Sequence, residues 1–137
     1  MSMILYPYAA CVLIQDPNTG LILGVSRKDN PDDVNLPGGK CDKGEDELTA
    51  ALRELLEETG VLLKAAPQKC YADLTSPGKD GKSYLTTTFR TTLAAEYVKI
   101  QTTEQGIVQW VTPAKLLEGS FADYNGKLFR YIGLEVK

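Results

Sequence analysis

Four charged residues of one short segment have the types and spacing to do chemistry together: Arg53, Glu54, Glu57 and Glu58. Glu54 stands three residues before Glu57 and four before Glu58, so a helix would gather the three carboxylates on one face. Like charges at these spacings destabilise a helix by about a few tenths of a kcal/mol per pair. Such a cluster suits a hard divalent cation, which takes oxygen ligands. A solvated acidic face on an amphipathic helix is the alternative interpretation.

The flanking residues define the helix that would carry these glutamates. Pro37, Gly38 and Gly39 exclude a helix before it and permit a tight loop whose backbone can approach a ligand. Acidic residues then crowd one helix N-terminus, where the helix dipole favours negative charge. We expect a helix over residues 46–58 that ends at Gly60, since glycine readily forms a left-handed C-terminal cap.

Residues 39–61 resemble the signature of the Nudix hydrolases, and we refer to this segment as the box. The signature reads glycine, five residues, glutamate, seven residues, arginine-glutamate, an aliphatic residue, any residue, two glutamates, any residue, glycine and an aliphatic residue. The chain fills every fixed position: Gly39, Glu45, Arg53, Glu54, Leu55, Glu57, Glu58, Gly60 and Val61. The preceding Leu-Pro-Gly-Gly string, which ends at Gly39, is also typical of the family.

The resemblance implies hydrolysis of a nucleoside diphosphate linked to another group. It implies that Glu54, Glu57 and Glu58 bind the metal, together with a backbone carbonyl at Gly38 or Gly39. Magnesium (Mg2+) is the expected ion, with manganese (Mn2+) as the alternative, because magnesium binds through carboxylates and substrate phosphates. A cation is also required physically, since glutamates alone would repel an approaching pyrophosphate.

Two glutamates are candidates for the general base that deprotonates the attacking water. Glu54 lies in the box, and Glu104 lies on the loop before the strand with the only tryptophan. An exposed loop glutamate is the alternative interpretation of Glu104. The resemblance assigns Glu45 and Arg53 to structural work, with Arg53 orienting one of the glutamates.

Three residues are candidate substrate contacts. Arg27 ends a predicted strand, where a basic residue of the family often contacts phosphate, and Lys40 follows the glycine pair. Asn125 comes shortly after Phe121 and before an apolar helix, much as a base-reading asparagine does in MutT-like members. The alternatives are a surface arginine and an asparagine that forms a turn with Gly126. Aromatic residues on strands could stack on a base or belong to the core: Tyr84, Phe89 and Trp110.

The sequence leaves the substrate open between classes. The short chain and Asn125 favour a nucleoside triphosphate, as in MutT-like enzymes. Residues 74–78 loosely resemble the serine-proline-glycine loop of ADP-ribose pyrophosphatases, although Lys79 and Lys82 stand where acidic residues usually follow. A non-catalytic, nucleotide-sensing Nudix domain is the alternative from another class, but such domains usually lose a box glutamate and this chain keeps them all.

The composition limits the number of domains and the kinds of binding partner that we expect. The 137 residues suffice for one domain with its own core, so we expect a single Nudix domain over residues 1–137. The net charge of −3 comes without a basic block, which argues against polymeric nucleic acid as a partner. No stretch is long enough to span a membrane. We expect a small-molecule nucleotide as the partner and a monomer or homodimer.

Histidine and cysteine usage narrows the chemistry further. The chain has no histidine, which excludes every triad with an imidazole base. Its three cysteines are widely spaced, so neither a zinc site nor a disulfide framework is expected. A reducing cytoplasm fits this pattern.

The order of apolar and polar segments predicts an α/β (α+β) fold. The resemblance makes this specific, as an α/β/α sandwich with a mixed curved sheet and the catalytic loop-helix-loop at one end. We expect a loop over residues 28–35, a short helix after Thr112-Pro113 and a last helix over residues 121–136. The predicted strands are residues 4–15, 21–26, 61–71 with a break near Pro67, 83–93 and 107–111.

Overall fold

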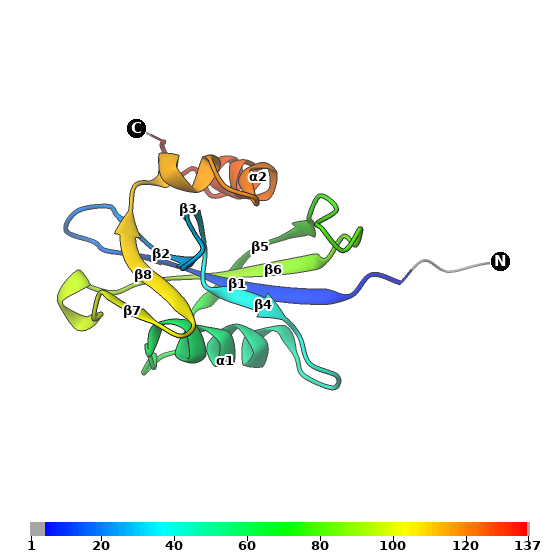
Figure 1. The fold of residues 1–137 in the computed structure, drawn as a ribbon, viewed down its shortest axis with the longest axis horizontal. Helices are drawn as coiled ribbons and strands as arrows, with labels where there is room; N and C mark the ends of the chain where they lie inside the picture. The colour runs from blue at the N-terminus through cyan, green and yellow to red at the C-terminus, as the bar shows by residue number, and fades with distance from the viewer. Residues whose placement is uncertain (1–4, 137) are drawn as a thin grey trace.

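A mixed β-sheet lies between two helices in the computed structural model of the protein, which describes residues 5–136. Helix α1 (Glu47–Thr59) covers one face of the sheet and α2 (Ala122–Ile132) the other, as Figure 1 shows. The strands are β1 (Tyr8–Gln15), β2 (Ile22–Arg27), β3 (Asn30–Asn35), β4 (Gly38–Lys40), β5 (Gln68–Leu74), β6 (Leu85–Thr92), β7 (Gln101–Thr103) and β8 (Gly106–Val111). Two short 3-10 helices complete the fold, η1 (Ala95–Tyr97) and η2 (Pro113–Leu117). The predicted sandwich is confirmed.

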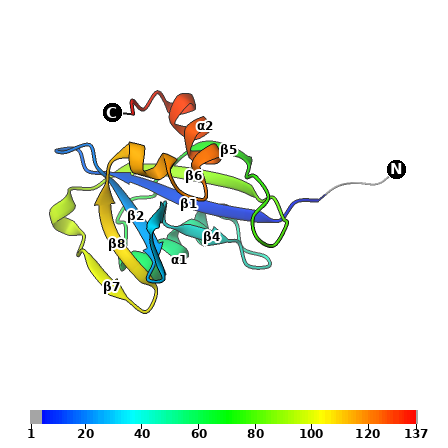
Figure 2. The same ribbon diagram turned by 45° about the horizontal axis from the view of Figure 1, so that its top comes forward.

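The main strand order is β5-β6-β1-β2-β8-β7, and β4, which carries Gly38 and Gly39, pairs with the central strand β1 outside this order. Within residues 5–136, only β1 and β6 pair in parallel, and the other neighbours are antiparallel. β1 and β2 share just one Cα pair, Gln15 with Ile22, and then diverge (Figure 2). β4 takes the vacated place beside the first half of β1, where Gly38 pairs with Cys11 and Gly39 with Ala10.

Strand β1 supplies both hydrophobic layers because successive side chains point to opposite faces. Val12 and Ile14 pack in the core cluster that includes Leu55 of α1. Leu13 packs in the other cluster, together with Leu128 of α2. The same central strand therefore supports the helix with the glutamates and the helix on the far side.

Both ends of α1 are capped, by Asp46, which was predicted as the first helical residue, and by Gly60, which was predicted as the cap. The Asp46 carboxylate accepts a hydrogen bond from the Thr49 N–H at 2.7 Å and caps the N-terminus. Gly60 adopts the left-handed conformation at φ 75° and donates its N–H to the Leu56 carbonyl. The predicted box helix is confirmed, and so are the strands predicted near residues 21–26, 83–93 and 107–111.

The predicted loop over residues 28–35 is wrong, because residues 30–35 form β3, which pairs with β2. The segment is polar because its first half is exposed on the sheet rather than because it lacks a partner. The predicted loop at Gly38 and Gly39 is likewise a short strand, β4.

Three predicted boundaries are also wrong. The first strand begins at Tyr8, after Pro7, and Ile4 lies outside the described residues. Residues 61–67 form no strand, and β5 begins after Pro67. The last helix ends at Ile132, because Gly133 adopts φ 72° and caps it. Within residues 5–136, no helix combines the length and apolar content needed to cross a membrane.

Gly106→Ala should destabilise the sheet at the β7–β8 turn. Gly106 has φ 135°, and an added Cβ would collide with the Ser26 carbonyl oxygen of β2. We expect a loss of about 2 kcal/mol or more in the free energy of unfolding, measured by urea denaturation. The matched control is Gly78→Ala, whose Cβ would meet only a carboxylate oxygen of Asp80 at 3.6 Å. Equal denaturation midpoints for both variants would refute this reading of the turn.

Candidate functional site

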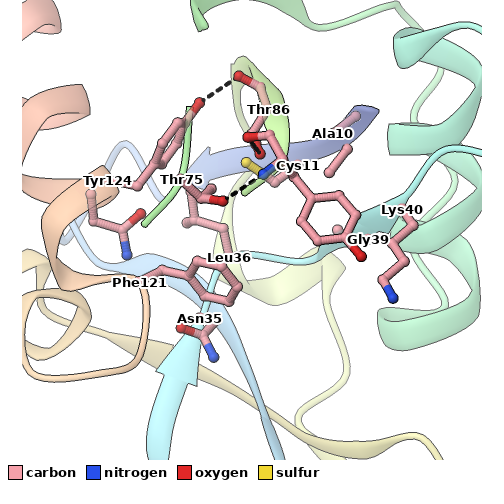
Figure 3. A pocket seen from close by; sticks show the side chains of 14 residues that line it. Ala10, Cys11, Asn35, Leu36, Gly39, Lys40, Thr75, Thr86, Phe121 and Tyr124 are labelled. Atoms are coloured by element: carbon pink, nitrogen blue, oxygen red, sulfur yellow. Dashed lines mark hydrogen bonds between the residues drawn. The ribbon is translucent and has the colours of Figure 1, made fainter. Parts of the chain in front are cut away.

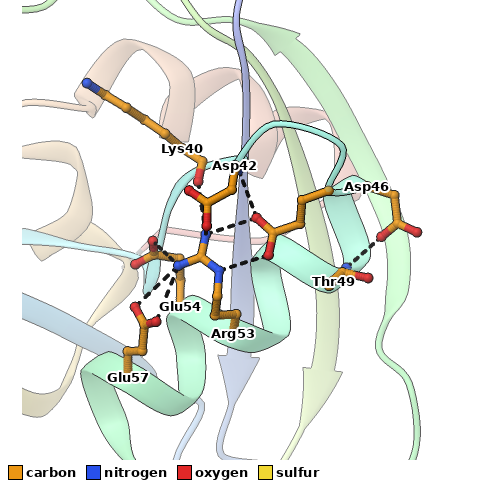
Figure 4. Close-up of polar contacts among 8 residues, drawn as sticks. Lys40, Asp42, Asp46, Thr49, Arg53, Glu54 and Glu57 are labelled. Carbon is orange, nitrogen blue, oxygen red and sulfur yellow. Dashed lines mark hydrogen bonds and ion pairs between the residues drawn. The ribbon is translucent and has the colours of Figure 1, made fainter.

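Arg53 of α1 lies at the centre of the acidic cluster (Figure 4). Its Nε and Nη2 donate to both carboxylate oxygens of Glu45, at 2.8 and 3.0 Å. Its Nη1 donates to Glu54 at 3.0 Å and to Glu57 at 3.3 Å. A further bond from Nη2 reaches the Lys40 carbonyl at 3.2 Å. The planar guanidinium group of Arg53 thus links helix α1, the turn before the helix and strand β4.

Glu45 is held by this arginine before the helix begins. The hydrogen bonds from Arg53, helped by the Asp42 N–H at 2.9 Å, lower the pKa of Glu45 to about 2. The same contact with Glu45 raises the pKa of Arg53. Both residues therefore remain charged and paired, in a structural arrangement that supports the glutamates behind them.

Glu54 lies against the glycine pair. A Cβ added at Gly39 would come within 2.7 Å of the Glu54 side-chain carboxyl carbon, so only glycine permits this approach. Burial raises the pKa of Glu54, while the bonds from Arg53 oppose that shift. Gly39 thus allows the Glu54 carboxylate to lie against the backbone of β4.

Glu58 is the most deeply held of the three glutamates. Its Oε1 accepts a hydrogen bond from the Gly38 N–H at 2.7 Å, so its partner is backbone rather than a cationic side chain. Burial, reinforced by repulsion from Glu54 and Glu57, raises the pKa of Glu58 to about 7. A nearby cation would favour its ionised form.

The donor set fits a divalent ion, although it is not a finished coordination sphere. In the described part of the chain, no three Cys, His, Asp or Glu side chains are already gathered as metal ligands. Glu54 and Glu57 are engaged with Arg53, and the Glu57 side chain is 50% exposed. Oxygen donors beside a buried carboxylate are nevertheless the chemistry that magnesium requires.

Two cavities of about 230 Å³ each meet beside this helix. The first lies between the sheet and the start of α2, with Tyr124 and Phe121 on one side and Lys40 and Gly39 on the other (Figure 3). The second is bordered by Glu58 of the box. The two cavities share four lining residues: Asn35, Leu36, Gly38 and Phe121. A ligand that filled both would cross the Gly38 backbone beside Glu58.

Two predicted substrate contacts line the first cavity. Lys40 Nζ lies 3.8 Å from an Asp80 carboxylate oxygen and 5.2 Å from the centre of the Tyr84 ring. Asn125 is 2% exposed, and its Nδ2 donates to the Leu116 carbonyl at 3.0 Å. This bond uses one of the two Nδ2 protons, so the amide oxygen and the second N–H are left for a ligand.

The other two predicted residues lie toward the second cavity or beyond it. Arg27 lines that cavity, but it binds the exposed Asp29 carboxylate through two hydrogen bonds at 2.9 and 2.6 Å. Glu104 is exposed in the turn between β7 and β8, and its neighbour Gln105 is the residue that lines the cavity. Glu54 lies against the box backbone at Gly39, whereas Glu104 lines neither cavity.

Sequence reasoning missed several polar residues of the cavity walls. The Ser26 hydroxyl and the Asn35 amide oxygen are buried, and within residues 5–136 neither has a hydrogen-bond partner. Both residues line the second cavity. No sequence signal identified them, because the pairing of β3 with β2 that places them was not predicted. Among the aromatic candidates, Tyr84 lines the first cavity, whereas Phe89 and Trp110 pack in the core.

Several known proteins resemble this chain in sequence. The family model of the NUDIX domain matches residues 5–132. A protein of Bacillus subtilis (strain 168), provisionally named an 8-oxo-dGTP diphosphatase, is 32% identical over 82% of this chain and 70% of its own length. An RNA pyrophosphohydrolase of Rhizobium meliloti (strain 1021) is 41% identical, and the match covers 51% of this chain and 50% of that protein. This chain therefore matches only half the length of the second relative.

Solved structures share the fold at lower identity. The dihydroneopterin triphosphate pyrophosphohydrolase of E. coli has a TM-score of 0.73 at 19% identity, over 95% of this chain and 99% of that chain. An Ap4A hydrolase of C. elegans has a TM-score of 0.70 at 21% identity, over 94% and 97%. At these identities the likeness concerns the fold alone.

Glu45→Gln should change how stability depends on pH. The pKa of Glu45 falls from 4.5 to about 2 on folding, so its ionised form stabilises the protein above about pH 4.5 and this contribution is lost as the pH falls toward about 2. We expect the variant to melt at a lower temperature than wild type at neutral pH and to lose less stability on acidification. Thermal melts across this window, with the exposed Glu96→Gln as control, check the prediction. Parallel pH profiles for wild type and Glu45→Gln would contradict it.

Proposed function

The chain belongs to the Nudix hydrolase family, and from that premise we propose that it cleaves a nucleoside diphosphate linked to another group, with a nucleoside triphosphate as the first candidate substrate. One observation carries the proposal. The box helix sets Glu54 and Glu58 against the glycine backbone, and Glu58 borders the second cavity, which shares Gly38 with the first. A pyrophosphate joining two substrate groups would lie at this junction.

The proposed metal ligands are Glu54, Glu57 and Glu58, with a backbone carbonyl at Gly38 or Gly39. Magnesium, or manganese in its place, would neutralise phosphate charge and lower the pKa of a bound water. The chain's own contribution is to hold the carboxylates in position, through Arg53 for two of them and through the Gly38 N–H for the third.

Two residues remain candidates for the general base, Glu54 and Glu104. Burial raises the pKa of Glu54, which brings a carboxylate closer to the range useful for proton transfer. Glu104 would have to reach the site from the exposed β7–β8 turn. Arg53 acts by orienting its neighbours, since its donors are occupied by Glu45, Glu54 and Glu57.

The first cavity is the proposed nucleobase site. Its walls combine apolar residues with the Tyr84 ring, which suits a planar base, and Lys40 stands where it could meet a phosphate. The Asn125 amide oxygen is an acceptor for an amino or ring N–H group of a purine. The similarity to a relative provisionally named for 8-oxo-dGTP supports a nucleoside triphosphate.

ADP-ribose, or another nucleotide derivative, is the second candidate substrate, and the second cavity favours it. The buried Ser26 hydroxyl and Asn35 amide oxygen lack partners within residues 5–136 and could bind the hydroxyl groups of a second sugar. Arg27 borders the same cavity and could contact phosphate if it released Asp29. A sensor that binds nucleotide without cleaving it is the candidate from another class.

We propose a small nucleotide, rather than a polymer or a membrane, as the partner. The net charge of −3 weighs against an RNA substrate, even though relatives named RNA pyrophosphohydrolases match part of the chain. The three free cysteines are consistent with a reducing cytoplasm. A monomer or a homodimer would each serve this function.

A product screen tests the proposed activity. Purified protein is incubated with nucleoside triphosphates and their oxidised forms, ADP-ribose, dinucleoside polyphosphates, nucleotide sugars and a 5′-triphosphorylated RNA, with magnesium and with EDTA. We expect magnesium-dependent release of a nucleotide from one class. If a nucleotide binds but no class of substrate is cleaved, the result would favour the nucleotide sensor instead.

Glu57→Gln and Glu58→Gln should each reduce turnover by about 100-fold or more, because each removes a carboxylate from the proposed metal site. Steady-state rates at saturating magnesium measure the loss, and circular dichroism verifies the fold. Glu47→Gln, in the first turn of the same helix, is the matched control and should retain activity. Near-normal turnover of both variants would remove these residues from the metal site.

Asn125→Ala should weaken purine substrates more than pyrimidine substrates. The change removes the side-chain amide of a residue that lines the first cavity, and loss of the proposed hydrogen bond to the base should raise KM for purines by about 10-fold. Measuring kcat/KM on matched purine and pyrimidine triphosphates checks the difference. An equal loss on both classes would exclude Asn125 from base recognition.

A further inference from the structure

A chain of buried hydrogen bonds ties the first turn of α2 to the centre of the sheet. The Tyr124 hydroxyl donates to the Thr86 carbonyl at 3.1 Å and lies 2.7 Å from Thr88 Oγ1. Thr88 Oγ1 in turn lies 3.1 Å from the Cys11 sulfur. Thr88 is fully buried, and Tyr124 is 4% exposed.

Counting protons assigns a single donor-to-acceptor direction to this series of hydrogen bonds. The Tyr124 hydroxyl has one proton, which goes to the Thr86 carbonyl because a carbonyl can only accept. Thr88 must then donate to the Tyr124 oxygen, and the Cys11 thiol must donate to Thr88. Burial raises the pKa of Cys11 to about 12, which keeps the thiol protonated for that role. Removal of the Tyr124 hydroxyl would leave both the Thr86 carbonyl and the Thr88 hydroxyl without this partner.

Helix α2 depends on this connection because its start has no side-chain cap. In the described chain, Phe121 stands at the N-cap position and its side chain caps no N–H of the first turn. Three side chains attach the first turn elsewhere: the Tyr124 hydroxyl bonds to β6, the Asn125 amide to the Leu116 carbonyl, and the Asp123 carboxylate accepts from the exposed Ser76 hydroxyl. The adjacent residues Tyr124 and Asn125 both line the first cavity.

We propose that Tyr124 is a positioning residue for base selectivity, which it exerts by fixing the first turn of α2 and thereby the Asn125 amide oxygen over the first cavity. The inference rests on the proposed function, since it assumes that this cavity binds the base. The ring of Tyr124 forms part of the wall, and its hydroxyl bonds to Thr86 and Thr88 of β6. The hydroxyl can therefore be tested without removing the wall.

Tyr124→Phe keeps the ring and removes only the hydroxyl. We expect KM for the preferred purine nucleotide to rise by about 10-fold, with a smaller change for the matched pyrimidine nucleotide. The kcat should stay within about two-fold of wild type, because the box carboxylates lie on α1, on the opposite face of the sheet. Thr88→Val removes one of the two bonds of the Tyr124 hydroxyl and should cause a smaller change in the same direction, whereas Thr88→Ser keeps a hydroxyl and should behave as wild type.

The matched control is Tyr131→Phe, on the same helix, where the side chain is 71% exposed. It should leave KM, kcat and the purine-to-pyrimidine ratio unchanged. A fall in melting temperature for Tyr124→Phe without a change in that ratio would overturn the inference, and so would a fall in kcat at constant KM.

Direct binding separates failure of the inference from failure of the proposed function. Equilibrium dialysis of purine and pyrimidine triphosphates with wild type and Tyr124→Phe reports selectivity even where turnover is absent. Purine-selective binding by wild type that Tyr124→Phe loses would support the inference. If wild type cleaves nucleotides while Tyr124→Phe keeps full selectivity, the inference alone fails. If wild type binds no nucleotide, the proposed function fails and the inference falls with it.

Discussion

Arg53 places one positive charge among carboxylates that repel one another along α1. Glu45 takes two of its donors and keeps a low pKa, which fixes the guanidinium plane before the helix begins. With that plane fixed, Nη1 donates to Glu57 and to Glu54, which lies against Gly39 of β4. A lysine could supply the positive charge but not the planar, forked set of N–H donors. The arrangement therefore depends on the geometry of the guanidinium group as well as on its charge.

The divergence of β1 and β2 makes room for the site. If β2 had paired along all of β1, no edge would have been left for β4, and the glycine pair could not have entered the sheet. Its entry brings the Gly38 N–H to Glu58 and the Gly39 backbone to Glu54. A Cβ at Gly38 would collide with β1 and one at Gly39 with the Glu54 carboxylate, so the glycine pair couples sheet topology to carboxylate position.

The local features of the box were predictable from sequence, whereas contacts between distant segments were not. The cap at Asp46, the end at Gly60 and the shared face of the glutamates follow from residue types within one helix. β3 was missed because its polar residues form a strand only through pairing with β2. The bond between Tyr124 and Thr88 joins residues 36 apart, and no local pattern indicates it. The family could therefore be predicted from the sequence more clearly than the residues that line the cavities.

That difference has a physical basis in the two faces of the sheet. The carboxylates belong to α1, while the walls of the proposed base site come from β1, β4, the segment before β6 and the start of α2. Substitutions around α2 can reshape those walls without contacting Arg53 or its carboxylates, so one box can serve many substrates. The intact box thus identifies the reaction class, whereas the proposed base contact at Asn125 belongs to α2, on the other face of the sheet.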